Sequence, residues 1–298
     1  MSSPSSPHLF VFGLGYSGGA LARCQRQLGW RVGGTSRKPQ VVTALLEEGI
    51  ETILIEEGEA SGAASDALAE TTHLLSTVPP DAEGDPILRH YGAAIAAAPR
   101  LSWIGYLSTT GVYGDHGGGW VEEDTPPAPT SERSRRRLTA EQAWLSLQQE
   151  ESGPSVQIFR LAGIYGPGRN PLEALRAGRA RRIVKPGQVF GRIHLDDIVS
   201  VLQASMAQPS PGAIYNVSDD EPADPAAVVA YAADLLGLEP PPAIPFEEAD
   251  LSPLARSFYA DNRRVSNRRI KEELGVTLAH PSYREGLIAL EAQGRDRV

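Results

Sequence analysis

The chain has 298 residues, with 28 Lys and Arg against 37 Asp and Glu, which gives a formal net charge of −9. Hydrophobic residues make up 41% of it, enough to fill a core, so a disordered or collagen-like chain is excluded. The acidic balance argues against a general nucleic-acid binder, and the single cysteine, Cys24, excludes an intramolecular disulfide and a cysteine-based metal cluster.

The N-terminal segment shows no targeting signal. Residues 1–7 are rich in Ser and Pro and contain no basic residue, so we expect a flexible tail there. The apolar run that follows is interrupted by Gly13 and Gly15 and is too short to cross a membrane. A lone cysteine suits a reducing compartment. We therefore expect a cytoplasmic protein with neither a membrane nor a nucleic acid as its partner.

The first elements in chain order predict a βαβ unit. An apolar strand is expected at residues 9–12, a glycine-rich turn at 13–19, a helix at 20–28 that ends at Gly29, and a second strand at 30–35. A strand, helix and strand within about thirty residues imply a right-handed crossover and a parallel sheet.

The same alternation continues and predicts a doubly wound α/β fold. A Rossmann domain is expected over residues 8–166, with returns near 194–218, and a smaller C-terminal α/β lobe mainly over 167–298. Further helices are predicted at 41–48, in an Ala-rich stretch near 60, at 87–98 and at 139–149, and further strands at 52–55, 72–78, 103–108 and 156–161.

The glycine-rich turn has the spacing of a dinucleotide-binding motif. Gly13, Gly15 and Gly18 follow the first strand and open the first helix. In this context the first glycine makes a tight turn, the second lets a pyrophosphate approach the backbone, and the third lets helix and strand pack closely. The helix N-terminus then favours the phosphate charge. This placement predicts a dinucleotide site.

The same residues contain a competing motif. Gly15, Ser17 and Gly19 match the nucleophile turn of α/β-hydrolases, and residues 116–119, His-Gly-Gly-Gly, match their oxyanion loop. A hydrolase places its serine after a middle strand, with the oxyanion loop upstream of it. Here the serine follows the first strand and the loop lies about a hundred residues downstream, so the dinucleotide interpretation is favoured.

The end of the second predicted strand indicates which dinucleotide is bound. An NAD-binding protein usually has Asp or Glu there for the ribose 2′-hydroxyl. Here Ser36, Arg37 and Lys38 occupy that place, and no carboxylate appears before Glu47. A guanidinium forms strong charge-assisted contacts with phosphate. The sequence therefore favours NADP(H) over NAD(H).

Five motifs in a fixed order resemble a known superfamily. Residues 108–114 read Ser-Thr-Thr-Gly-Val-Tyr-Gly, and similar matches occur at 160–168, 192–198, 215–218 and 266–275. The chain resembles the extended short-chain dehydrogenase/reductases, which include sugar-nucleotide epimerases and dehydratases. The cofactor contacts expected from the motif and the resemblance are Gly13, Leu14, Gly15, Tyr16, Ser17, Gly18, Ser36, Arg37, Lys38, Val78, Ser108 and Arg137.

The resemblance also implies the catalytic positions, and two of them depart from the family pattern. Members use a Ser or Thr, a Tyr and a Lys, and these places fall on Thr109, Arg133 and Arg137. Arginine stays protonated at any working pH, so Arg133 cannot act as a general acid or base. Both arginines could still hold an anionic substrate or the cofactor ribose. Thr110 and Gly111 replace the dehydratases' Asp-Glu pair, which argues against dehydration chemistry.

Other polar residues in these motifs have structural interpretations. Tyr113 and Tyr165 occupy positions that are generally structural in the superfamily. His194, followed by Asp196 and Asp197, is expected to form the start of a helix and its cap. The remaining histidines show no ligand spacing, so no metal site is expected.

Two functions remain open from the sequence. The first is an atypical NADP(H)-binding oxidoreductase or epimerase-like enzyme that acts on a carbonyl or alcohol of an anionic or sugar-nucleotide-like small molecule. The second is a non-catalytic dinucleotide-binding, redox-sensing regulatory protein. The sequence fits either a monomer or a homodimer.

Overall fold

The computed structural model describes residues 6–56, 59–148 and 153–295, and the predicted tail at 1–7 lies mostly outside them. Within these residues no helix is both long and apolar enough to cross a membrane. The chain forms two compact units, each built from three segments. The first comprises Met1–Thr109, Arg135–Arg160 and Val201–Tyr215, and the second Thr110–Ser134, Leu161–Ser200 and Asn216–Val298.

A seven-stranded sheet dominates the first unit and has the order β11-β7-β5-β4-β1-β2-β3. Neighbouring strands from β3 to β5 pair in parallel. The predicted doubly wound α/β fold is therefore confirmed. The strands are β1 (His8–Phe12), β2 (Arg31–Ser36), β3 (Glu51–Leu54), β4 (His73–Ser76), β5 (Trp103–Thr109), β7 (Ser155–Leu161) and β11 (Ile214–Val217).

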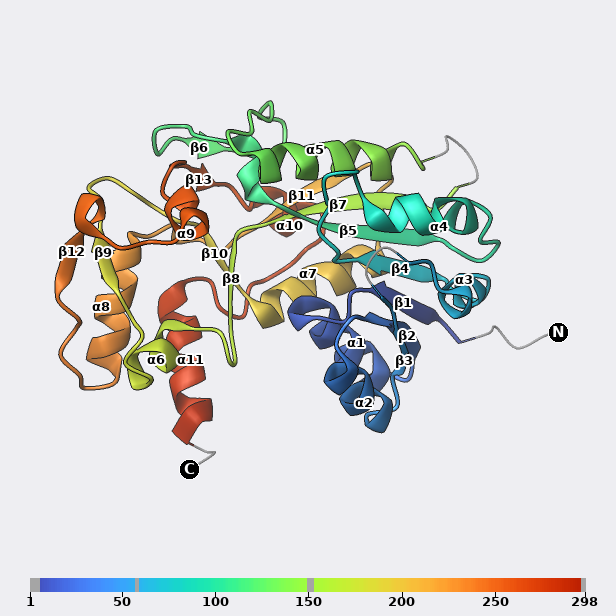
Figure 1. The fold of residues 1–298 in the computed structure, drawn as a ribbon, viewed down its shortest axis with the longest axis horizontal. Helices are drawn as coiled ribbons and strands as arrows, with labels where there is room; N and C mark the ends of the chain where they lie inside the picture. The colour runs from blue at the N-terminus through green and yellow to red at the C-terminus, as the bar shows by residue number, and fades with distance from the viewer. Residues whose placement is uncertain (1–5, 57–58, 149–152, 296–298) are drawn as a thin grey trace. The chain divides into compact units, whose positions relative to one another are not determined.

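Helices cover both faces of this sheet, with α1 and α2 on one side and α4 and α5 on the other (Figure 1). Gly29, with φ of +84°, follows the end of α1 as expected. The predicted helix at 139–149 begins seven residues earlier, because the arginine-rich stretch before it is helical although it lacks an apolar repeat. The helices are α1 (Tyr16–Gln27), α2 (Pro39–Glu47), α3 (Gly62–Leu68), α4 (Pro86–Ala96) and α5 (Glu132–Leu145).

The core of the first unit lies between the sheet and the helices α3, α4 and α5. Phe10 and Phe12 of β1 pack there with Tyr91 and Trp144, all of them fully or almost fully buried. Burial of each such side chain contributes about 1.5–3 kcal/mol. Asp85 caps α4 and also accepts a 2.9 Å hydrogen bond from the Trp144 indole, which links α4 to α5.

The second unit contains three two-stranded parallel sheets and several helices. Its boundaries differ from the predicted ones, since residues 110–134 and 161–166 belong to it rather than to the Rossmann domain. Leu172, Val228, Tyr283 and Leu287 form its main core with Tyr165. Its strands are β6 (Trp120–Val121), β8 (Gly163–Tyr165), β9 (Arg182–Val184), β10 (Arg192–His194), β12 (Ala243–Pro245) and β13 (Arg264–Val265). In the three sheets β6 pairs with β13, β8 with β10, and β9 with β12. Its helices are η1 (Thr110–Tyr113), α6 (Pro171–Arg176), the start of α7 (Leu195–Ala207), α8 (Pro225–Leu235), η2 (Phe246–Glu248), α9 (Pro253–Phe258), α10 (Arg268–Glu272) and α11 (Tyr283–Arg295).

Candidate functional site

The turn between β1 and α1 is shaped by its first glycine. Gly13 has φ of +92°, a conformation that side chains avoid, and a Cβ there would lie 2.5 Å from the Thr77 Oγ1 atom. The Thr77 hydroxyl also donates a 2.7 Å hydrogen bond to the Gly13 carbonyl oxygen. Thr77 follows β4, so the neighbouring strand fixes the turn. Sequence reasoning missed Thr77, whose only signal is its place at the end of an apolar strand.

The other two glycines of the motif differ in their surroundings. A Cβ on Gly18 would lie 2.6 Å from the Gly13 carbonyl oxygen and 2.9 Å from Val11 Cγ1, so close packing of α1 on β1 requires glycine there. A Cβ on the exposed Gly15 would meet no atom of the described residues within 4 Å. Packing within the unit therefore requires glycine at positions 13 and 18. It does not require glycine at position 15, where the space that a Cβ would enter is open, and we call this space the open side of Gly15. This is the side on which a bound phosphate would approach the backbone.

The N-terminus of α1 adds favourable electrostatics to this open side. The helix begins at Tyr16, and its N-cap residue, Gly15, provides no side-chain hydrogen bond to the first turn. A helix N-terminus carries a partial positive charge and favours an anion. Leu14 and Ser17 are buried at 2% and 8% exposure. Because Ser17 is buried within the helix, the hydrolase interpretation, which needs an accessible serine nucleophile, has no support here.

The end of β2 is held against the glycine turn. The Leu14 N–H donates to the Thr35 carbonyl oxygen at 2.7 Å, and the Gly13 N–H donates to the Thr35 hydroxyl at 3.2 Å. Ser36 is buried and accepts a hydrogen bond from the Lys38 N–H, whereas the Arg37 and Lys38 side chains are exposed. Two cations therefore follow the strand that contacts the turn, at the place where the sequence predicts the 2′-phosphate.

Two further residues support the turn from β2 and from the end of β4. A Cβ on Gly34 would overlap the Val11 carbonyl oxygen, so β1 and β2 approach each other only with glycine at that position. Val78 is half-buried, and its Cγ2 would lie 3.2 Å from a Cβ on Gly13. The predicted contact residue Val78 therefore lies beside the glycine turn. The sequence predicts only that Gly34 belongs to a strand, and does not indicate its close approach to β1.

A buried ion pair lies beneath the end of β5. Arg160 Nη2 and Glu141 Oε2 are 2.8 Å apart, and both side chains are at most 3% exposed. The Ser108 hydroxyl donates a short hydrogen bond to Glu141 Oε1. Ser108 is therefore positioned by a carboxylate on α5, and its hydroxyl hydrogen is directed into the protein rather than toward a ligand.

Arg137, which the resemblance aligns with the family lysine, contacts the main chain of β5. Its Nη1 donates to the Leu107 carbonyl oxygen at 2.7 Å and to the Tyr106 hydroxyl at 3.2 Å. Burial is the largest cause that raises the pKa of Tyr106 above its usual range, although the Arg137 charge opposes it. Tyr106 therefore remains protonated. Arg137 links α5 to the strand that ends at Thr109, and its half-buried guanidinium has further donors.

Arg133, which the resemblance aligns with the family tyrosine, lies one helical turn before Arg137 on α5. Its side chain is exposed, and its guanidinium lies 4.9 Å from the centre of the Phe258 ring in the second unit. Phe258 is itself 49% exposed. An exposed guanidinium on an exposed aromatic ring is suited to binding an anion, and it has no acidic proton to donate at neutral pH.

The two motif tyrosines use their hydroxyls inside the second unit. Tyr113 is fully buried and donates a 2.7 Å hydrogen bond to Asn216 Oδ1. Tyr165 is 6% exposed and donates to the Ser282 carbonyl oxygen at 3.2 Å. Burial raises the pKa of the Tyr165 hydroxyl well above its usual range. These contacts are those of structural residues, as the resemblance implies.

The start of α7 has the expected capping arrangement. His194 is fully buried, and its Nδ1 accepts the Asp196 N–H at 3.2 Å. Asp197, also fully buried, accepts the N–H groups of Ala279 at 2.6 Å and His280 at 3.1 Å. Burial is the largest cause that raises the pKa of the Asp197 carboxyl, and these N–H groups oppose it. No sequence pattern indicates that His280 lies beside His194.

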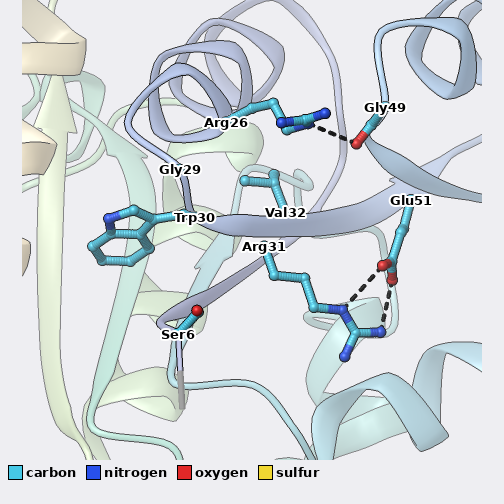
Figure 2. Close-up of a pocket in the computed structure, with 8 residues that line it drawn as sticks. All are labelled: Ser6, Arg26, Gly29, Trp30, Arg31, Val32, Gly49 and Glu51. Carbon is cyan, nitrogen blue, oxygen red and sulfur yellow. Dashed lines mark hydrogen bonds and ion pairs between the residues drawn. The ribbon is translucent and has the colours of Figure 1, made fainter. Parts of the chain in front are cut away.

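A surface hollow of about 330 Å³ lies at the amino ends of the strands in the first unit's sheet, whereas the glycine turn lies at a carboxyl end. Figure 2 shows that it is formed around Trp30 and the start of β2. Its charged groups are satisfied within the protein, since Arg31 pairs with Glu51 at 2.9 Å and Arg26 donates to the Gly49 carbonyl oxygen. It lies at the amino ends of β2 and β3, away from the glycine turn, and it is therefore not the candidate cofactor site.

The strand order and the glycine turn are those of a Rossmann-like α/β fold, and the order of the motifs resembles that of the extended short-chain dehydrogenase/reductases. The model of the NAD dependent epimerase/dehydratase family matches residues 93–218. The chain is also 35% identical over 242 residues to Protein YeeZ of Escherichia coli K12. The aligned region covers 78% of this chain and 84% of that protein. The chain belongs to the NAD-dependent epimerase/dehydratase family.

Two solved structures are similar over nearly the whole chain. A conserved protein of unknown function from Silicibacter pomeroyi DSS has a TM-score of 0.89 and 52% identity, covering 97% of this chain and 99% of that one. MoeE5, solved with UDP-glucose and NAD, has a TM-score of 0.76 and 22% identity, covering 98% and 99%. The second likeness shows the common fold.

Proposed function

We propose that the protein binds NADP(H) at the glycine turn and acts as an oxidoreductase or epimerase-like enzyme on a carbonyl or alcohol of an anionic small molecule. The open side of Gly15 carries this proposal, because the motif keeps a glycine where packing within the protein requires none. The uncapped start of α1 supports it with favourable charge. A relative with this fold binds NAD and UDP-glucose, which supports a nicotinamide cofactor and an anionic substrate.

The preference for NADP(H) rests on the end of β2. Arg37 and Lys38 are exposed beside the turn, and residues 31–46 contain no carboxylate that would accept bonds from a ribose 2′-hydroxyl. A guanidinium–phosphate contact of this kind contributes about 1.5–3 kcal/mol. We therefore expect NADP(H) to bind about 10- to 100-fold more tightly than NAD(H).

The chain's own residues would position a substrate rather than protonate it. Bound dinucleotide supplies or accepts a hydride at its nicotinamide ring. Thr109, the last residue of β5, would orient the substrate oxygen with its hydroxyl. Arg133 would bind an anionic group of the substrate, and Arg137 would hold β5 and direct its remaining donors toward the ribose. Neither arginine releases a proton at neutral pH, so the proton would come from another group or from water.

The cofactor proposal is tested by calorimetric titration of the full-length protein with NADP⁺, NADPH, NAD⁺ and NADH. We expect the two phosphorylated forms to bind more tightly, and Arg37→Asp to reverse this order. Arg89→Asp makes the same charge change at an exposed site of the same unit and should leave the order unchanged. An unchanged preference in Arg37→Asp would place the 2′-phosphate elsewhere, and no binding of any form would overturn the cofactor proposal.

The catalytic proposal is tested separately, by the absorbance of reduced nicotinamide with NADPH and a panel of anionic aldehydes and ketones, and with NADP⁺ and a panel of anionic alcohols that includes sugar nucleotides. We expect a carbonyl compound to oxidise NADPH or an alcohol to reduce NADP⁺. Because an epimerase regenerates its cofactor, the sugar nucleotides are also analysed for a changed configuration. No absorbance change and no epimer, with NADP(H) bound, would favour the second candidate, a dinucleotide-binding regulatory protein without turnover. The observation behind that candidate is that α5 presents Arg133 and Arg137 where the family has its acid and its lysine.

A further inference from the structure

Three potential metal ligands converge at the start of α7 in the second unit. His194, Asp196 and His280 each offer one ligand atom, and these atoms all lie within 4.8 Å of one another. The closest Asp196 oxygen is 3.6 Å from His194 Nδ1 and 3.7 Å from His280 Nε2. Metal–ligand bonds of about 2.0–2.2 Å at tetrahedral angles place ligand atoms about 3.3–3.6 Å apart. The distances from Asp196 to the two histidines are therefore close to those between ligand atoms in a zinc site.

The backbone that carries these ligands is fixed by Asp197. This fully buried carboxylate accepts the N–H groups of Ala279 and His280, and so joins the segment before α11 to the first turn of α7. His280 is thereby held beside His194, with the two ring centres 3.9 Å apart. The ligands belong to segments more than eighty residues apart, and a second carboxylate, that of Asp197, holds those segments together.

The charges and the exposure of the three groups suit a cation. Asp196 brings a carboxylate to the group, and each histidine offers one imidazole nitrogen. His194 is fully buried, and its Nδ1 is the ring nitrogen that faces the Asp196 carboxylate. Asp196 is 59% exposed in its side chain, which leaves a route for an ion to enter from solvent.

We propose that His194, Asp196 and His280 form a binding site for a divalent first-row metal ion of the zinc class. Two imidazoles and one carboxylate are a donor set that such ions accept, with open positions completed by water. The ion ties the segment at residue 280 to α7. This proposal is independent of the function proposed above. Sequence reasoning expected no metal, because His280 lies 86 positions beyond His194 and no spacing connects them.

One contact competes with the ion. His194 Nδ1 accepts the Asp196 N–H at 3.2 Å, and an ion on this nitrogen takes over its lone pair. The displaced N–H belongs to the first turn of α7, where backbone donors have no partner within the helix and bond to water instead. The site therefore exchanges one long hydrogen bond for coordination.

The test uses the full-length protein, treated with a chelator and dialysed, then titrated with Zn²⁺ alone against a chromophoric competitor. We expect one equivalent to bind, and Co²⁺ in its place to give the intense visible absorption of a tetrahedral site. Asp196→Asn and His280→Gln should each weaken Zn²⁺ binding at least about 100-fold, more than the loss of an outer partner would. Asp66→Asn and His116→Gln make the same changes at sites outside the group and should leave the affinity unchanged.

Two results would overturn the proposal. One is the absence of stoichiometric binding in the unsubstituted protein. The other is binding that Asp196→Asn leaves as tight as before, which would indicate adventitious surface sites. Circular dichroism and the melting temperature without metal report whether His280→Gln has folded. If it has not, Asp196→Asn decides the matter, because its exposed side chain can be replaced without opening the core.

Discussion

The glycine turn and the β5–α5 region illustrate two ways in which a candidate site is specified. At the turn, each glycine has a local reason: Gly13 has a positive φ, Gly18 lies against β1, and Gly15 faces open space. At the end of β5, the important contacts join residues far apart in the chain, as in the pair of Glu141 with Arg160. The first region is defined by backbone conformation and spacing, and the second by partners that only the fold brings together.

The largest expected effect is the loss of stability when the buried ion pair of Glu141 and Arg160 is broken. Glu141→Gln removes the negative charge beside the buried Arg160, so we expect a loss of about 3–5 kcal/mol in the free energy of unfolding, measured with urea. The matched control is Glu48→Gln, which breaks the exposed pair with Arg23 and should cost less than about 1 kcal/mol. Equal losses in the two variants would show that burial is not what makes the β5–α5 region sensitive.

The next effect separates binding from stability within the turn. Gly15→Ala fills the open side without meeting protein atoms, so we expect unfolding to change by less than about 1 kcal/mol. The affinity for NADP⁺, measured by calorimetry, should fall about 100-fold, because the methyl group occupies the place of the phosphate. Gly18→Ala is the contrast, with an expected loss of about 1–3 kcal/mol in stability from overpacking. Unchanged NADP⁺ affinity in Gly15→Ala would remove the main support for the cofactor site.

The smallest expected effect concerns the contact between β4 and the turn. Thr77→Val keeps the shape of the side chain but removes the hydrogen bond to the Gly13 carbonyl oxygen. We expect a loss of about 1 kcal/mol in stability, with a comparable loss in NADP⁺ affinity. Thr43→Val removes a hydroxyl on the exposed surface of α2 and serves as the control. A variant as stable as the unsubstituted protein, with full affinity, would show that the glycines hold the turn without Thr77.

Much of the first unit could be predicted from the sequence because its signals are local. Short apolar runs, a glycine turn and alternating helices indicate a parallel sheet, and the strands at residues 9–12 and 103–108 correspond to β1 and β5. The start of α5 was placed seven residues too late, since arginine-rich helical turns have no apolar repeat. The roles of Thr77 and Glu141 had no local signal, because each contacts a residue more than thirty positions away.

The sequence by itself determined the fold class, the family motifs and the position of the glycine turn. These depend on backbone geometry and hydrophobic spacing, which act over a few residues. Only the tertiary structure decided which polar groups meet: Arg137 with the β5 main chain, Arg133 with Phe258, and His280 with His194 and Asp196. Hydrogen bonds and ion pairs act over a few ångströms, so the path of the whole chain decides which residues come within that range.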